Sequence, residues 1–263
     1  MGIAAADGCW GLNAALMNVT LIIANTLAAL VFSFSLVAVL IYLPWRIRHS
    51  YRQTFLALAR AVEAREPHLL GHAEQAARYV VLMARWRGMG FSATRRLEYA
   101  ALLHGIGKVS VPYGLLNSPA CLTSPADRFV LRDYVRVGAA ILDAIPILQP
   151  TADIVRYHHE YMDGSGYPFG RYGSAISFEA QMLCVASEYV AMTTPRLYRA
   201  ALSLTPAQAE AYLREQAGYR YSPRVVSLFL RAKASENFRL RFLGLARRAV
   251  GYFHVAPLSR RVL

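Results

Sequence analysis

Apolar residues are concentrated near the start of the chain. From Gly8 to Trp45 the sequence contains no Asp, Glu, Lys, Arg or His, and the stretch Val19–Leu43 is nearly all apolar. A helix crosses the hydrocarbon core of a bilayer with about 20 apolar residues. The pattern therefore predicts one transmembrane helix, at about residues 19–43, within an N-terminal segment that comprises residues 1–45.

The residues that flank this stretch predict its orientation. Only Asp7 is charged before it, whereas Arg46, Arg48 and Arg52 follow it closely. Cationic flanks stay on the cytoplasmic side, and Trp45 suits the membrane interface. The alternative, a cleaved signal peptide, would need a basic start, a shorter apolar core and a small-residue cleavage site. We therefore expect a single-pass protein with its N-terminus outside and its domain inside.

After the apolar segment, the hydrophobic positions follow helical periods and no convincing alternating strand appears. One face of a predicted helix over residues 52–65 holds Phe55, Leu58, Ala59 and Val62. Periodicity, or Ser or Thr before Pro, predicts further helices at residues 74–86, 92–104, 151–161 and 178–192 and starting near 125, 206 and 223. Residues 163–173 are rich in glycine and predict a loop. We expect an all-α domain of about seven helices over residues 46–232.

Charge adds a separate feature at the C-terminal end. The chain has 29 Lys and Arg residues against 16 Asp and Glu, and residues 231–263 hold eight of the cations and one acidic residue. Attraction of such a tail, residues 233–263, to anionic lipid is worth about 1 kcal/mol per cation near the surface. A solvated tail is the alternative. No nucleic-acid-binding motif accompanies the charge, so we expect no nucleic-acid partner.

Histidine, rather than cysteine, is the candidate for metal chemistry. The three cysteines are widely spaced and form no CxxC pair, which argues against a disulfide framework or a cysteine-based zinc site. By contrast, His72 opens one predicted helix, His104 closes another, and His158 and His159 stand together before the glycine-rich loop. Neutral imidazole is a common metal ligand. The four histidines therefore form a candidate metal site.

These motifs resemble the HD-GYP family. The stretch from His158 to Pro168 reads HHEYMDGSGYP and fills every fixed position of the family's HHExxDGxGYP signature. Gly71-His72 is similar to the family's first histidine motif, and His104–Lys108 (HGIGK) to its HDxGK motif. Residues 196–199 (RLYR) resemble the family's RPYR motif. The resemblance covers about residues 50–232.

The resemblance implies a fold, a reaction and a location. The fold is an all-α HD domain with two or three metal ions, often iron or manganese, that hydrolyses the bacterial messenger cyclic di-GMP. Lys108, Arg196 and Arg199 would hold phosphates. A bacterial inner membrane is the implied location. The loop residues Asp163, Gly164, Gly166, Tyr167 and Pro168 would shape the site or bind a signalling protein such as a GGDEF cyclase.

Three positions depart from the family's ligand pattern. The aspartate of the HD pair falls on Gly105, a later histidine on Tyr134, and the last metal aspartate on Ser187. Two divalent ions need carboxylates to offset their charge, and none of these residues supplies one. His68, four residues before His72, is a possible substitute ligand on the same helix face.

The departures favour a non-catalytic reading. We expect a degenerate, membrane-anchored protein of cyclic di-GMP signalling that binds a nucleotide or a protein, with one divalent metal ion or none. The alternative is an active metal-dependent phosphodiesterase with a variant site that holds two iron or manganese ions, in which Lys108 would take part in catalysis.

Overall fold

The computed structural model describes residues 4–117, 124–194 and 203–236 and divides the chain into two units, Met1–Thr54 and Phe55–Leu263. In the first unit, helix α1 (Ala4–Val37) continues through a π-helical segment, Ala38–Tyr42, into α2 (Leu43–Glu63). The large apolar side chains between Leu16 and Leu43 are exposed, up to 76% for Phe34. Among the described residues this is the one helix long and apolar enough to cross a membrane. It is a candidate span.

The second unit is built from helices, as the periodicity predicts. After the end of α2 these are α3 (His72–Trp86), α4 (Phe91–Leu103), α5 (Tyr113–Asn117), α6 (Pro125–Asp143), α7 (Gln149–Tyr157), α8 (Phe178–Thr193), α9 (Pro206–Glu215) and a helix over residues 223–236. Within the described residues, β-pairing is limited to one isolated bridge between Ala217 and Tyr221. The all-α prediction is confirmed.

The helix starts follow the capping signals in the sequence. Thr205 accepts the backbone N–H of Gln208, and the Gln208 side chain accepts the N–H of Thr205, so two otherwise unpaired donors of α9 are satisfied together. At the start of α6, ahead of Pro125, the Ser124 side chain accepts the backbone N–H of Asp127. Helix α4 differs from the prediction, because Gly90 occupies the N-cap position and Ser92 lies inside the first turn.

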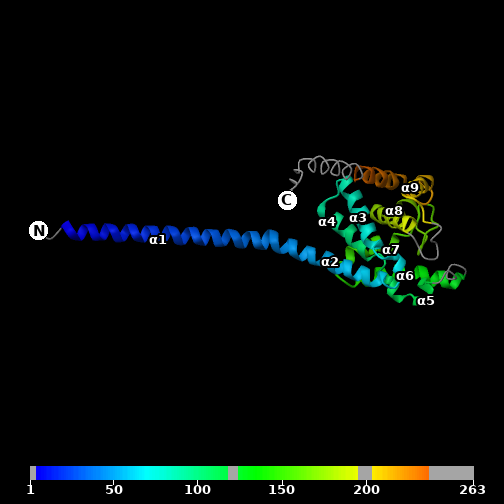
Figure 1. Cartoon of the computed structure of the whole chain (residues 1–263), viewed down its shortest axis with the longest axis horizontal. Helices are drawn as coiled ribbons and strands as arrows, with labels where there is room; N and C mark the ends of the chain where they lie inside the picture. Colours follow the sequence, from blue (N-terminus) through cyan, green and yellow to red (C-terminus); the bar gives the residue numbers. More distant parts are fainter. Residues whose placement is uncertain (1–3, 118–123, 195–202, 237–263) are drawn as a thin grey trace, which may run out of the picture. The chain divides into compact units, whose positions relative to one another are not determined.

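The core lies where α3, α4, α7 and α8 pack together (Figure 1). Val80, Met83, Leu97 and Leu183 are fully buried there. Burial of each such side chain stabilises the fold by roughly 1.5–3 kcal/mol. The same packing brings the ends of α4 and α7 and the start of α3 close to one another, and these are the ends at which the histidines stand.

Two details of the amphipathic prediction need correction. Leu58 was expected on the buried face of its helix but is 44% exposed, whereas its neighbours Leu56 and Ala59 are buried. The helix predicted over residues 151–161 is α7, which begins at Gln149 and ends at Tyr157, with His158 as its C-cap. The turn that follows α7 leads directly into the glycine-rich loop.

Candidate functional site

Four histidines from three helix ends form one cluster. His72 is the first residue of α3, and His104 and His158 are the C-caps of α4 and α7. The ring centroids are 5.2 Å apart for His72 and His104, 5.3 Å for His104 and His158, and 4.1 Å for His158 and His159. The sequence prediction that these residues share a site is therefore consistent with their geometry.

Backbone carbonyls fix the tautomer of two of these rings. Nδ1 of His104 lies 2.7 Å from the carbonyl oxygen of Ala101, and Nδ1 of His158 lies 2.6 Å from that of Val155. A carbonyl oxygen only accepts, so each Nδ1 carries the proton and each Nε2 presents a lone pair when the ring is neutral. Burial lowers the pKa of His104 to about 4, and burial followed by the charge of His159 lowers that of His158 well below its usual value. Both rings are neutral at pH 7.

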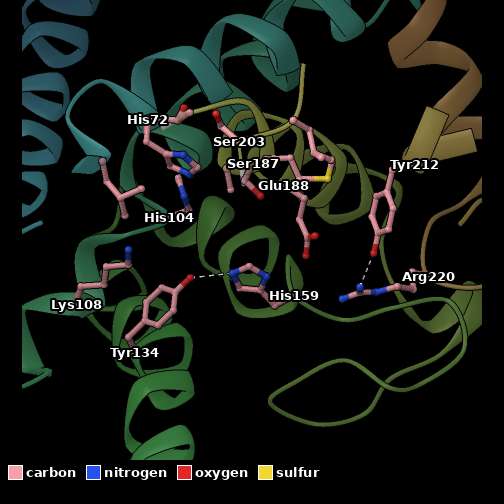
Figure 2. A pocket seen from close by; sticks show the side chains of 15 residues that line it. His72, His104, Lys108, Tyr134, His159, Ser187, Glu188, Ser203, Tyr212 and Arg220 are labelled. Carbon is pink, nitrogen blue, oxygen red and sulfur yellow. Dashed lines mark hydrogen bonds between the residues drawn. The ribbon is translucent and has the colours of Figure 1, made fainter. Parts of the chain in front are cut away.

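Tyr134 is hydrogen-bonded to one ring nitrogen of His159. The Tyr134 hydroxyl lies 2.8 Å from Nε2 of His159 (Figure 2), and the His159 ring stacks on Tyr167 at a centroid distance of 4.8 Å. Burial, and then the neighbouring Tyr167, raise the pKa of Tyr134 well above 10, so the hydroxyl keeps its proton. Burial also lowers the pKa of His159 to about 3. The pair is therefore a neutral hydrogen bond at the position where the family has two histidine ligands.

Gly105 is not required by the backbone or by packing. Its φ of −87° is open to any residue, and a Cβ added to it would meet no atom within 4 Å. Gly107 is a contrast, because a Cβ there would lie 1.9 Å from the carbonyl oxygen of Tyr134. A Cβ atom at position 105 would therefore meet no clash, and neither the backbone nor close packing requires a glycine there.

Ser187 and His68 differ in position and contacts from what the sequence predicts. The Ser187 hydroxyl donates to the carbonyl of Cys184 one turn earlier in α8, at 3.1 Å. His68 was expected on the helix face of His72, but it lies in a separate 3₁₀ turn, Pro67–Leu69, and Gly71 with φ of +84° divides the two. The Nε2 atom of His68 is 4.0 Å from a carboxylate oxygen of Glu66.

The donor set does not fit a two-metal centre. Among the described residues, no group of three or more His, Cys, Asp or Glu side chains is arranged to hold a metal ion. At a separation of about 4 Å and a dielectric constant of about 20, two divalent ions would repel each other by roughly 16 kcal/mol. Neutral imidazoles, a protonated tyrosine and a serine offset none of that charge. The residues present therefore do not support a reaction that depends on two metal ions.

The cluster opens into a cavity of about 500 Å³ that has a cation on each side (Figure 2). Lys108 lies on one side, where its ammonium group is 2.7 Å from the buried carboxylate of Glu66. Arg220 lies on the other, where it donates to the Tyr212 hydroxyl at 2.9 Å. No motif in the sequence points to Arg220, which follows Gly218 and Tyr219. Arg196 and Arg199 lie outside the described residues.

The glycine-rich loop is held against the histidine cluster. The backbone N–H of Tyr167 donates to the carbonyl of His159 at 3.0 Å, and a Cβ on Gly166 would lie 2.4 Å from that same oxygen. Asp163 accepts from both the backbone and the hydroxyl of Ser165. Glu160 is buried and accepts two loop N–H groups. Glu160 and Asp163 therefore fix the loop, as the resemblance implies.

The outer side of this loop borders a second, external cavity. It has a volume of about 460 Å³ and is lined by Gly166, Tyr167, Pro168 and α6 residues that include Arg132 and Phe129, the latter 72% exposed. Gly164 adopts φ of +79°, which a glycine permits without strain. The Tyr167 ring itself packs inward on His159. A partner on this side would therefore contact mainly the loop backbone, Pro168 and Phe129.

Comparisons with known proteins show which family the second unit resembles. Residues 57–225 match the family described as HD domain. The chain is 35% identical over 185 residues to "Cyclic di-GMP phosphodiesterase response regulator RpfG" of Xanthomonas campestris pv. campestris, which covers 70% of this chain and 48% of that protein. It is 29% identical over 186 residues to "3'3'-cGAMP-specific phosphodiesterase 2" of Vibrio cholerae, with 70% and 35% covered. The chain thus spans half or less of these relatives.

A solved structure is similar in fold. The cyclic GMP-AMP specific phosphodiesterase V-cGAP3 of Vibrio cholerae superposes with a TM-score of 0.55 at 14% identity, over 72% of this chain and 49% of that one. At that identity the similarity concerns the helical fold alone.

Proposed function

The chain belongs to the HD domain family and carries the HD-GYP signature, and on that premise we propose that it binds a cyclic dinucleotide of the cyclic di-GMP class without hydrolysing it. Its curated relatives are named phosphodiesterases of such dinucleotides. A cavity of about 500 Å³ is within the range of small-molecule sites. Lys108, at one side of this cavity, is a cation suited to a phosphate of such a ligand.

One observation underlies the absence of hydrolysis. The Tyr134 hydroxyl is hydrogen-bonded to Nε2 of His159, at 2.8 Å, in the place of a metal ligand. Together with Gly105 and Ser187 it leaves the cluster without a carboxylate. The resemblance implies hydrolysis by two metal ions that activate a water molecule. Uncharged ligands do not offset the repulsion between two such ions. The preserved part of the site is then a binding pocket.

The alternative, an active phosphodiesterase, is favoured by one feature. Nε2 of His158 is buried and has no hydrogen-bond partner among the described residues, as is also true of Nδ1 of His159. An unpaired buried nitrogen costs about 1–3 kcal/mol, and a metal ion would remove that cost. A single ion on the histidines is the form of cofactor binding that this feature supports.

The two candidates differ in metal content and product. The full chain is purified in detergent micelles without oxygen or chelators, from cells supplied with iron and manganese. We expect one metal ion per chain or none, saturable binding of cyclic di-GMP in equilibrium dialysis, and no linear dinucleotide or GMP after prolonged incubation. About two ions per chain together with linear product would establish the phosphodiesterase instead.

Membrane anchoring and a protein partner complete the proposal. We propose that the apolar helix that begins before Val19 anchors the domain in a bacterial inner membrane, with the domain in the cytoplasm. The long exposed apolar helix supports this. The outer face of the loop at Gly166 and Pro168, beside Phe129, is the surface we propose for a GGDEF-type or other signalling protein. The basic tail, for which attraction to anionic lipid and a solvated state are the two expectations, lies outside the described residues except for residues 233–236.

A further inference from the structure

The Glu188 carboxylate is held in place at the cavity wall. Its two oxygens accept hydrogen bonds from the hydroxyl groups of Tyr161, at 2.5 Å, and Tyr221, at 2.8 Å. Both tyrosines are buried, which leaves the carboxylate little freedom to rotate. Each carboxylate oxygen has two lone pairs, so one acceptor position on each oxygen remains available. Glu188 lines the same cavity as the histidine cluster.

Arg220 is fixed beside it through the same tyrosine. Its guanidinium group lies 4.2 Å from the centroid of the Tyr161 ring and donates one N–H to the Tyr212 hydroxyl. A guanidinium has five N–H donors in a rigid fork, so most of them remain for a ligand. Although burial alone would lower the pKa of Arg220, Tyr161 and Glu188 raise it overall, and the group stays charged.

An acceptor pair next to a donor fork is complementary to one nucleobase. Guanine presents two adjacent donors, N1–H and N2–H₂, beside two acceptors, O6 and N7. A carboxylate accepts from the first pair, and arginine donates bidentately to the second. Adenine has a donor where guanine has O6 and an acceptor where guanine has N1–H, so it would meet both residues with the wrong polarity.

The surroundings suit a planar base. Figure 2 shows Tyr212 and Arg220 on one side of the cavity and Lys108 and Tyr134 on the other, with Glu188 and His159 between them. The wall also includes Met192 and Leu204, and the Leu204 N–H donates to the Met192 carbonyl at 2.9 Å. The cavity wall thus combines the aromatic ring of Tyr212 with apolar side chains. Aromatic rings provide a surface on which bases stack favourably.

We propose that Glu188 and Arg220 form a guanine-reading site, with Tyr212 as the residue that positions Arg220, at the end of the cavity opposite Lys108. The proposal rests on the proposed function and deepens it, because it assigns one base of the dinucleotide to one side of the cavity. Such a site makes the protein bind guanine-containing ligands more tightly than ligands that contain only adenine.

The test compares guanine and adenine probes on the full chain in detergent micelles. Affinities are measured by titration calorimetry for cyclic di-GMP, cyclic di-AMP, GMP and AMP. A bidentate base contact discriminates by about tenfold or more. We expect wild type to prefer cyclic di-GMP to cyclic di-AMP, and GMP to AMP, by at least that factor. The variant Glu188→Gln should bring both ratios close to one.

Matched variants separate base reading from folding. Glu179→Gln alters another carboxylate of α8, one paired with Arg96 outside the cavity, and should leave both ratios unchanged. Arg220→Lys keeps the charge but loses the paired N–H donors of the guanidinium group, and it should reduce the preference for guanine. If Glu188→Gln does not fold, this variant provides the deciding measurement. Melting curves by circular dichroism establish which variants are folded.

The outcomes distinguish this inference from the proposed function. Equal binding of cyclic di-GMP and cyclic di-AMP by wild type, or a guanine preference that persists in folded variants at positions 188 and 220, overturns the guanine site and leaves dinucleotide binding intact. Preference for GMP over AMP without binding of any cyclic dinucleotide supports the guanine site and overturns the proposed function. Binding of none of the four probes overturns both.

Discussion

The neutral histidine cluster makes the stability of the domain depend on pH. His104 and His158 are buried, and His159 is partly buried. Loss of hydration, as the largest cause, lowers the pKa of all three, to about 4 for His104 and about 3 for His159. In the unfolded chain a histidine titrates near pH 6.5. Above that value neither state is protonated, and the stability is fully present. As the pH falls below it, the unfolded state takes up protons that the native state does not, and stability is lost.

The size of the loss follows from these shifts. For one such histidine, acidification from about pH 7 to about pH 5.5 lowers the free energy of unfolding by about 1.2 kcal/mol. The three together give about 4 kcal/mol, which is a large share of the 5–15 kcal/mol, roughly, that stabilises a typical domain. Glu63 has the opposite effect at lower pH, because burial raises the pKa of its carboxyl group. Between about pH 7 and about pH 5.5 the change in the free energy of unfolding therefore reflects mainly the histidines.

The assay is urea unfolding of the full chain in detergent micelles, followed by near-ultraviolet circular dichroism at several pH values. The variant His104→Asn keeps a donor for the Ala101 carbonyl but removes the titrating ring, so the loss should fall by about a third. The matched control is His49→Asn, at an exposed position in the first unit, which should leave the loss unchanged. A loss below about 1 kcal/mol in wild type would refute the reasoning, because the native rings would then have to take up protons as readily as unfolded ones.

Three further predictions follow from single positions. Gly107→Ala should destabilise the domain by several kcal/mol or prevent folding, because its Cβ would lie 1.9 Å from the Tyr134 carbonyl, whereas Gly105→Ala should be close to neutral; equal urea midpoints for the two variants would contradict this. Gly105→Asp alone should not produce phosphodiesterase activity, since Tyr134 and Ser187 remain; robust hydrolysis of cyclic di-GMP by that variant would show that one carboxylate suffices. A reporter fused after Leu263 should be active only as a cytoplasmic fusion, and a periplasmic signal would reverse the proposed topology.

The sequence by itself determined the elements and the composition of the site. Helical periods and the cap at Thr205 predict the helices because capping and amphipathicity are local properties. The apolar segment from Val19 to Leu43 is equally local, and the structure has a long exposed apolar helix there. The signature from His158 to Pro168 predicts the loop that packs on the histidine cluster. It also identifies the positions at which expected ligands are absent.

Only the tertiary structure decided what these side chains contact. The hydrogen bond between Tyr134 and His159 joins α6 to the end of α7, and no spacing in the sequence implies it. His68 is four residues before His72, a separation that would place both residues on one face of a helix. The left-handed Gly71 interrupts that helix, so the two residues do not share a helix face.

The far side of the cavity is also a product of packing. Glu188 and Arg220 are brought together by Tyr161, which lies on a third segment of the chain and contacts both. These contacts join residues that are far apart in the sequence, such as Tyr161 and Glu188, which are separated by 27 positions. Local sequence patterns give no information about contacts of this kind. At Gly105, likewise, only the structure shows that a Cβ atom would meet no neighbour within 4 Å, so that packing does not require the glycine.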